Sequence, residues 1–187
     1  MSRRLLSIAA LILAVTGSGL SAQEAENQVP TYEDLPEGAL YFKEDHKDWR
    51  IRCQKNSAAE DSCQMFQLIV DGQGSPVAQI VFFDIPAGEG FAVAGATITV
   101  PLLTALSEDF LLQIDDHPPK AYPYAYCDKV GCYVRLGVTP VELNWLKSGT
   151  LAKIATVPYR SPDQRRVFPI SLSGFTSAYD ALIELSR

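Results

Sequence analysis

The stretch FLLQIDDHPPKAYPYAYCDKVGCYVRL, residues 110–136, contains most of the patterns that decide the fold. Apolar and polar residues alternate over 110–115, which is typical of a half-buried strand, and the Asp- and Pro-rich residues 116–119 end it. Residues 121–127 alternate again, and a short turn bounded by two cysteines then returns the chain into another strand. The stretch therefore predicts three consecutive strands joined by turns.

Four tyrosines are concentrated in this stretch. Tyr122, Tyr124 and Tyr126 lie on one face of the strand predicted over 121–127, and Tyr133 lies in the next strand. Aromatic ladders of this kind stabilise sheets, so packing between neighbouring strands is one interpretation. The other is an aromatic contact surface beside a rigid turn, and these four tyrosines are therefore the candidate binding surface.

The N-terminus has the three parts of a secretory signal peptide. Arg3 and Arg4 provide the positive charge, residues 5–15 form an apolar run, and residues 16–22 are small and end at Ala22. We expect residues 1–22 to be a signal peptide cleaved after Ala22. The apolar run is too short to span a bilayer as a retained helix, and no later segment predicts a transmembrane helix.

Composition limits the partners and the number of domains. Loss of residues 1–22 would remove two arginines and no acid, changing the net charge from −6 to −8. A chain this acidic has no electrostatic footprint for nucleic acid, so we expect no nucleic-acid partner. Residues 23–47 are rich in Glu, Pro and Gly and predict a flexible acidic arm. Residues 48–187 are enough for one domain with a real core.

The chain has four cysteines, Cys53, Cys63, Cys127 and Cys132, and an even number in an exported chain predicts two disulfides. Three connectivities are possible. We favour Cys53–Cys63 with Cys127–Cys132, because each pair is local and brackets turn-forming residues. Zinc binding is the competing interpretation, but the two spacings differ from those of zinc fingers and ribbons. They also lack the C-x-x-C spacing of a thioredoxin-like redox centre.

The remaining elements are short strands and two helices. Thr139, Pro140 and Glu142 form a capping box that starts a helix over 139–147. A second helix is predicted over 173–186, with Ser173 as its cap. Further strands are predicted over 49–54, 63–70, 77–85, 91–103, 132–137, 150–157 and 166–172. We predict a mainly β fold, a β-sandwich or barrel-like single domain with a short helix, a C-terminal helix and two local disulfides.

No pattern predicts a catalytic residue, a metal site or a cofactor. His46 and His117 are the only histidines, and Asp115-Asp116-His117 is interpreted as a solvated turn before two prolines rather than a metal ligand set or a base. Ser173 lacks the flanking pattern of a hydrolase nucleophile. Adjacent carboxylates such as Glu108-Asp109 point to opposite faces of a strand, so they do not converge on one substrate.

Several short motifs occur in an order that carries a family resemblance. They are Trp49-Arg50-Ile51-Arg52-Cys53 with Cys63, Val100-Pro101-Leu102, Leu112-Gln113-Ile114-Asp115, Tyr126-Cys127 with Gly131-Cys132, and Ser171-Leu172-Ser173-Gly174-Phe175 with Ala178 and Leu182. Together they resemble the invasion-associated locus B (IalB) family of exported Gram-negative proteins, over residues 49–185. The chain departs from the family at residues 103–109, where a Gly-containing turn is expected, and at Val134, which replaces a smaller residue.

The resemblance implies a β-rich protein of the periplasm or outer-membrane region, and some family members are linked to entry into host cells. It offers no catalytic residues to transfer. We therefore expect a non-enzymatic protein of the periplasm, outer membrane or cell surface that binds a protein or cell-envelope component. Host interaction, with virulence, is a further expectation. One alternative is a secreted enzyme acting on envelope material, which needs Asp115, Asp116 and His117 in a deep cleft. The other is a small-molecule carrier, which needs a closed barrel with an empty apolar interior.

Overall fold

The computed structural model describes residues 31–85 and 90–186, so the predicted signal peptide and residues 23–30 of the predicted arm lie outside the described residues. The chain divides into two compact units, Met1–Asp34 and Leu35–Arg187. In the described part of the first unit, the backbone amide and the hydroxyl of Thr31 donate to the Asp34 carboxylate at 3.0 and 2.7 Å. The described helices and strands all belong to the second unit.

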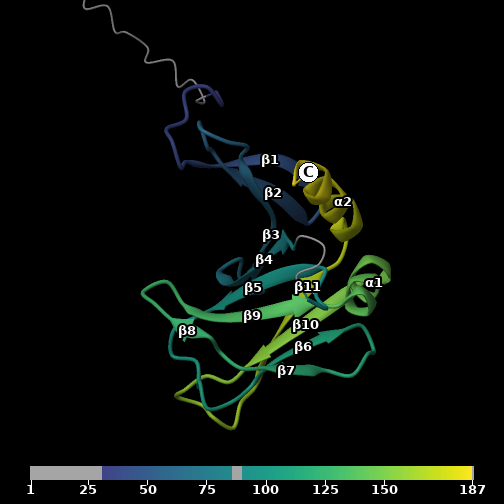
Figure 1. The fold of residues 1–187 in the computed structure, drawn as a ribbon. Helices are drawn as coiled ribbons and strands as arrows, with labels where there is room; N and C mark the ends of the chain where they lie inside the picture. Colours follow the sequence, from purple (N-terminus) through teal and green to yellow (C-terminus); the bar gives the residue numbers. More distant parts are fainter. Residues whose placement is uncertain (1–30, 86–89, 187) are drawn as a thin grey trace, which may run out of the picture. The chain divides into compact units, whose positions relative to one another are not determined.

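Seven strands of the second unit form the larger sheet, in the spatial order β1-β2-β3-β4-β5-β9-β8 (Figure 1). Every neighbouring pair is antiparallel. Alternation along β2 buries Trp49 and Ile51 on the inner face of the sheet and leaves Arg50 and Arg52 on the outer face. The strands are β1 Leu40–His46, β2 Trp49–Gln54, β3 Ser62–Val70, β4 Pro76–Asp84, β5 Ala94–Val100, β8 Tyr126–Cys127 and β9 Cys132–Val138.

The smaller sheet has four antiparallel strands in the order β11-β10-β6-β7. The described strands form two sheets and no closed barrel, so of the two predicted architectures the sandwich is confirmed. The predicted mainly β fold with a short helix, a C-terminal helix and two local disulfides is also confirmed. The strands are β6 Phe110–Ile114, β7 Lys120–Tyr122, β10 Leu151–Thr156 and β11 Arg166–Ser171.

One hydrophobic core includes residues of both sheets and of helix α2, Phe175–Leu185. Trp49, Phe82 and Phe175 make mutual edge-to-face contacts with ring centroids 5.2 to 5.7 Å apart, the geometry that aromatic quadrupoles favour. The Trp49 indole nitrogen donates to the Ser171 carbonyl at 2.9 Å, which links the two sheets. Helix α2 therefore covers the inner face of the β1–β4 half of the larger sheet (Figure 1).

The start of α2 differs from the sequence prediction. Its N-cap is Gly174, with φ 88°, and no side chain caps the helix, so the prediction of a Ser173 cap was wrong. A Cβ at Gly174 would lie 1.9 Å from the His46 carbonyl oxygen. Glycine is therefore required by the close approach of the β1–β2 turn and by the left-handed backbone, a contact with residues far away in the sequence.

Helix α1, Pro140–Ser148, is the element that the sequence predicted best. Thr139 and Glu142 form both hydrogen bonds of the capping box, and Lys120 of β7 adds an ion pair to the buried Glu142 carboxylate. Gly149 ends the helix in an extended conformation instead of a left-handed one. A Cβ there would lie 2.6 Å from the Trp145 carbonyl oxygen, so space rather than φ selects the glycine.

Strand β1 lies within residues 23–47, which the sequence analysis placed in an arm. The register of β1 against β2 shifts between Phe42 and Glu44, leaving Lys43 in a bulge. The bulge interrupts the two-residue alternation, so the pattern of a strand is not visible in the sequence. The sheet thus begins at Leu40, ahead of the predicted domain start at residue 48.

Candidate binding surface

The four predicted tyrosines do not form one surface. Pro123 has no backbone donor, and the strand predicted over 121–127 is divided there: β7 ends at Tyr122 in the smaller sheet, and β8 begins at Tyr126 in the larger sheet. Tyr124 lies between them, with its ring edge-on to Phe110 at 6.3 Å. Burial raises the pKa of Tyr124 to about 12. Tyr122 and Tyr124 pack against the core, and the predicted single ladder was wrong.

Tyr126 and Tyr133 remain together on the outer face of the larger sheet. They are directly opposite each other in the β8–β9 register, and their rings stack with centroids 4.5 Å apart. The guanidinium of Arg135, two residues along β9, lies 5.3 Å from the Tyr126 ring centroid. The pair is partly exposed, and it presents flat aromatic area with a cation beside it.

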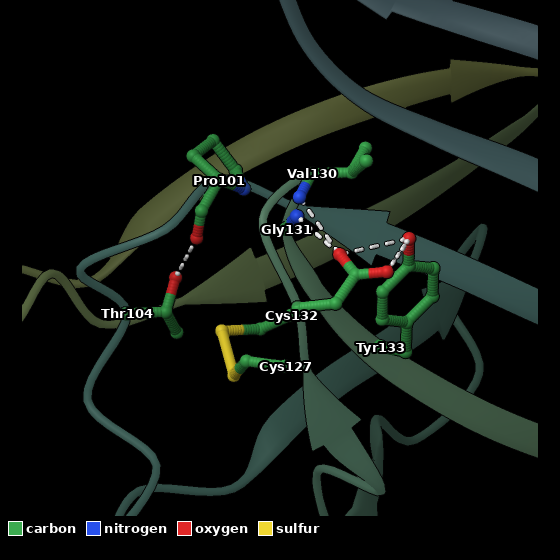
Figure 2. Close-up of a disulfide and its surroundings, with 8 residues drawn as sticks. Pro101, Thr104, Cys127, Val130, Gly131, Cys132 and Tyr133 are labelled. Carbon is green, nitrogen blue, oxygen red and sulfur yellow. Dashed lines mark hydrogen bonds between the residues drawn. A yellow bond between two sulfur atoms is a disulfide. The ribbon is translucent and has the colours of Figure 1, made fainter.

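The turn between these two strands is held rigidly. The Cys127–Cys132 disulfide joins opposite residues of β8 and β9, as Figure 2 shows, so the predicted pairing is present. The Asp128 carboxylate accepts hydrogen bonds from the Val130 and Gly131 amides at 2.7 and 3.2 Å and from the Tyr133 hydroxyl at 3.1 Å. The Val130 amide is the main cause of the lowered pKa of Asp128.

Gly131 lies against the end of β5. A Cβ at this position would be 2.5 Å from the Val100 carbonyl oxygen, so only glycine lets the turn approach that strand. The result is a turn fixed by a disulfide, a carboxylate and a close backbone contact, whose tip side chain, Val130, is 65% exposed. A rigid tip exposes an apolar side chain without the entropy cost of ordering a loop on binding.

The chain beside this turn, after β5, exposes a second apolar group. Leu103 has φ 64°, a conformation that is strained for a branched side chain, and it is 61% exposed. The strain is held by hydrogen bonds: the Leu103 carbonyl accepts from the Tyr159 amide at 2.7 Å, and the Thr104 hydroxyl donates to the Pro101 carbonyl at 2.8 Å (Figure 2). Leu103 is the first residue of the segment that departs from the Gly-containing turn expected from the family resemblance.

Two hollows adjoin this segment and share Val77, Pro101 and Leu102 in their linings. One, of about 400 Å³, also contacts Leu68 and Val130. The other, of about 310 Å³, lies on the side of Leu103 and Phe168. We use the name hairpin surface for the exposed aliphatic side chains that line them together with the partly exposed tyrosine pair: Leu68, Leu102, Leu103, Tyr126, Val130 and Tyr133.

The sequence analysis missed the aliphatic part of this surface. In the sequence, Pro101-Leu102-Leu103 has the pattern of the end of an apolar strand. The structure shows instead that Leu102 and Leu103 are exposed, in a turn where Leu103 has a positive φ. Val130 had a signal: a lone aliphatic residue at the tip of a Cys-bounded turn has nothing to pack against. Tyr126 and Tyr133 were identified because tyrosines are concentrated beside the Cys-bounded turn, and both lie in the two strands that this turn joins.

The other candidate residues have structural contacts. Asp115 has φ 41°, and its carboxylate accepts from the Leu151 amide at 2.9 Å and from the Thr150 amide at 3.2 Å. The His117 ring stacks on Trp145 at 3.9 Å. No group of three or more metal-ligating side chains occurs within residues 31–85 and 90–186. The Asp-Asp-His segment is a turn between β6 and β7 that contacts the start of β10 and helix α1.

The geometry defines a two-sheet β domain, stapled by two cross-strand disulfides, with an exposed apolar and aromatic surface at one staple. Comparison with known proteins identifies its family. The model of the invasion-associated locus B (IalB) protein family matches residues 49–183. The chain therefore belongs to the IalB family.

Individual relatives agree with this assignment. Invasion protein B homologs of Brucella abortus, from strain 2308 and from biovar 1 strain 9-941, are each 28% identical over 179 residues, which are 95% of this chain and 97% of the relative. The crystal structure of invasion associated protein B from Bartonella henselae matches with a TM-score of 0.66 at 23% identity, covering 76% of this chain and 95% of that one. The structural likeness supports the fold. Among the described residues, no helix is long and apolar enough to cross a membrane.

Proposed function

We propose that this IalB-family chain is a non-enzymatic exported protein that acts in the periplasm by binding another protein through the hairpin surface, with the outer membrane or the cell surface as an alternative location. One observation carries the proposal: two exposed apolar side chains lie near the Cys127–Cys132 disulfide, Val130 at the tip of a rigid turn and Leu103 in a strained backbone conformation. The Brucella and Bartonella relatives are named as invasion proteins, which supports a further role in host interaction.

The chemistry of the surface fits a protein partner better than a small polar ligand. Interface centres are enriched in tyrosine and arginine on rigid supports, and they fill shallow apolar hollows. Tyr126, Tyr133 and Arg135 supply the first feature, and the hollows lined by Val77 and Leu102 supply the second. Backbone strain at an exposed leucine, which costs stability, is expected where the side chain contacts a partner.

The two alternative functions have less support. An enzyme built on Asp115, Asp116 and His117 would need a free Asp115 carboxylate, but that group accepts hydrogen bonds from two backbone amides. A carrier would need a closed barrel with space inside, whereas the described strands form an open pair of sheets. Ile98 and Ile154, one from each sheet, are fully buried in their common core.

The test is site-specific crosslinking in living cells of the source bacterium. A photoreactive phenylalanine analogue replaces Val130, and in a matched control it replaces Lys153, an exposed residue of β10 in the smaller sheet. We expect a discrete protein adduct from position 130 that is absent at position 153 and is lost when Tyr126 and Tyr133 are both changed to Ser. Identical adducts at both positions, or an adduct that survives the tyrosine changes, would contradict the proposal.

Export is tested separately on the same cells. We expect the mature protein in the periplasmic or outer-membrane fraction, with an intact mass that corresponds to loss of residues 1–22. A full-length chain in the cytoplasmic fraction would refute export and leave the binding proposal to the crosslinking result.

A further inference from the structure

A second group of side chains on the outer face of the larger sheet lies at its other end, on β1, β2 and β3. Phe42 is opposite Arg52 in the β1–β2 register, and Arg50 is opposite Phe66 in the β2–β3 register. Each arginine also contacts the phenylalanine diagonal to it. The Arg50 guanidinium carbon lies 3.9 Å from the Phe42 ring centroid, and the Arg52 guanidinium carbon lies 4.7 Å from the Phe66 ring centroid. We call Phe42, Arg50, Arg52 and Phe66 the arginine patch.

The two arginines of the patch differ in how their charge is balanced. The Arg50 Nε donates to the Asp45 carboxylate at 2.6 Å. The Arg52 Nε is buried and has no hydrogen-bond partner, and within residues 31–85 and 90–186 no carboxylate forms an ion pair with Arg52. Burial also lowers the pKa of Arg52. A desolvated donor without a partner costs free energy, so this arrangement is unexplained by the stability of the free protein.

An arginine without an ion-pair partner is unexpected in this chain, because carboxylates outnumber cationic side chains. The net charge is −6, with 22 carboxylates available to pair with 16 lysines and arginines. Placing two arginines over aromatic rings on one exposed face creates a local site for anions on an otherwise acidic protein. Phe42 is 53% exposed, so the site also has apolar area that a ligand can cover.

We propose that the arginine patch binds an acidic polypeptide segment of a partner, with two carboxylates on Arg50 and Arg52. The two arginines are two residues apart on one strand, so their Cα atoms are about 7 Å apart, and acidic residues two apart in an extended peptide have the same spacing. Guanidinium groups bind carboxylates in a planar, bidentate manner. The patch goes beyond the function proposed above, because both of its arginines lie on β2, it shares only β3 with the hairpin surface, and it recognises charge where the hairpin surface recognises apolar groups.

The binding test uses the purified protein and two fluorescent six-residue peptides, one of alternating Glu and Thr and one of alternating Gln and Thr. We expect only the Glu peptide to bind, and Arg52→Gln to weaken its binding by about tenfold or more, the effect of losing a charged hydrogen-bonded pair. Arg135→Gln is the matched control, because it also removes one arginine charge from the outer face of the larger sheet. Arg135 lies over the Tyr126 ring, outside the patch, whereas Arg52 lies over the Phe66 ring. Equal binding of both peptides, or an equal loss in both variants, would overturn the proposal.

Two further measurements ask whether Arg52 serves the fold and whether the ligand is a lipid. Arg52→Met removes the unpaired charge and keeps apolar volume, so we expect the thermal midpoint of the free protein to rise while peptide binding is lost. A fall in the midpoint would show that Arg52 serves the fold and would overturn the proposal.

Sedimentation with phosphatidylcholine–phosphatidylglycerol vesicles tests whether the ligand is an anionic lipid. Arg52-dependent binding to the vesicles without binding of the Glu peptide would overturn the proposal in favour of a membrane surface.

Discussion

The two disulfide hairpins use the same cross-strand geometry in opposite surroundings. Cys53–Cys63 and Cys127–Cys132 each join directly opposed residues, with Cα atoms 4.1 and 4.0 Å apart. The first lies between two inner strands of the larger sheet, and Cys53 is fully buried. The second lies at the end of the sheet, and Cys127 is exposed.

The difference indicates a division of roles. The first hairpin carries Trp49 and Ile51 into the core, so its staple holds elements on which α2 packs. In the second hairpin β9 contributes Cys132, Val134, Leu136 and Val138 to the core, but β8 contributes no core residue, and the disulfide fixes a turn that presents Val130 and the Tyr126–Tyr133 pair. The same covalent device therefore serves mainly the stability of the fold in one place and mainly the shape of a surface in the other.

Removing each disulfide in turn tests this division with the largest expected effect. Changing Cys53 and Cys63 to Ala should lower the free energy of unfolding by about 3 kcal/mol or more, from the loop-closure entropy of a 10-residue separation plus a small core cavity. Changing Cys127 and Cys132 to Ala should cost about 2 kcal/mol, because the separation is only 5 residues. Urea unfolding measures both. A larger loss from the second pair would refute the assigned roles.

The second prediction concerns the backbone contact that fixes the exposed hairpin. Gly131→Ala should cost about 2 kcal/mol, since the new Cβ would meet the Val100 carbonyl oxygen and push the turn from β5. Gly72→Ala is the control: nothing lies within 4 Å of a Cβ there, so unfolding should be unchanged or slightly harder. Thermal unfolding of both variants decides the point, and equal midpoints would show that the contact at Gly131 is not a constraint.

A third prediction concerns the segment that follows β9, where Lys120 of β7 pairs with Glu142 in the first turn of α1. Burial raises the pKa of Glu142, but hydrogen bonds from Lys120 and Thr139 outweigh it, so the pKa is lowered overall. A lowered pKa in the folded state stabilises the protein above the ordinary carboxyl value, and that stability is lost as the pH falls through the folded value.

Glu142→Gln should therefore cost about 1 kcal/mol at pH 7, and the difference from the unmodified protein should shrink below about pH 4. Urea midpoints of the two proteins between pH 7 and pH 3 measure this. A constant difference across that range would mean that the carboxylate charge contributes nothing and that the amide loses only shape or capping geometry.

Local patterns predicted much of the fold, because short-range chemistry decides it. The capping box at Thr139 and Glu142, the pairing of the four cysteines and the strand bounds near Trp49 need only neighbours in the sequence. The failures depend on distant contacts. Gly174 is a glycine because of His46, and Tyr122 and Tyr126 separate because Pro123 lets the chain pass between sheets. The unpaired Arg52 has no sequence signal at all, since it depends on which side chains surround it.

The smallest effect on stability is expected at Leu103, the exposed residue of the hairpin surface that has a positive φ. Leu103→Gly relieves a positive φ, which should gain up to about 1 kcal/mol, less the entropy that glycine adds to the unfolded chain. Leu106 is similarly exposed but is not among the residues of positive φ, so Leu106→Gly should lose about 0.5 to 1 kcal/mol. If Leu103 is kept for its partner, Leu103→Gly should also weaken the crosslink at position 130. A variant that is less stable and crosslinks normally would show that the strained leucine serves the loop and not the surface.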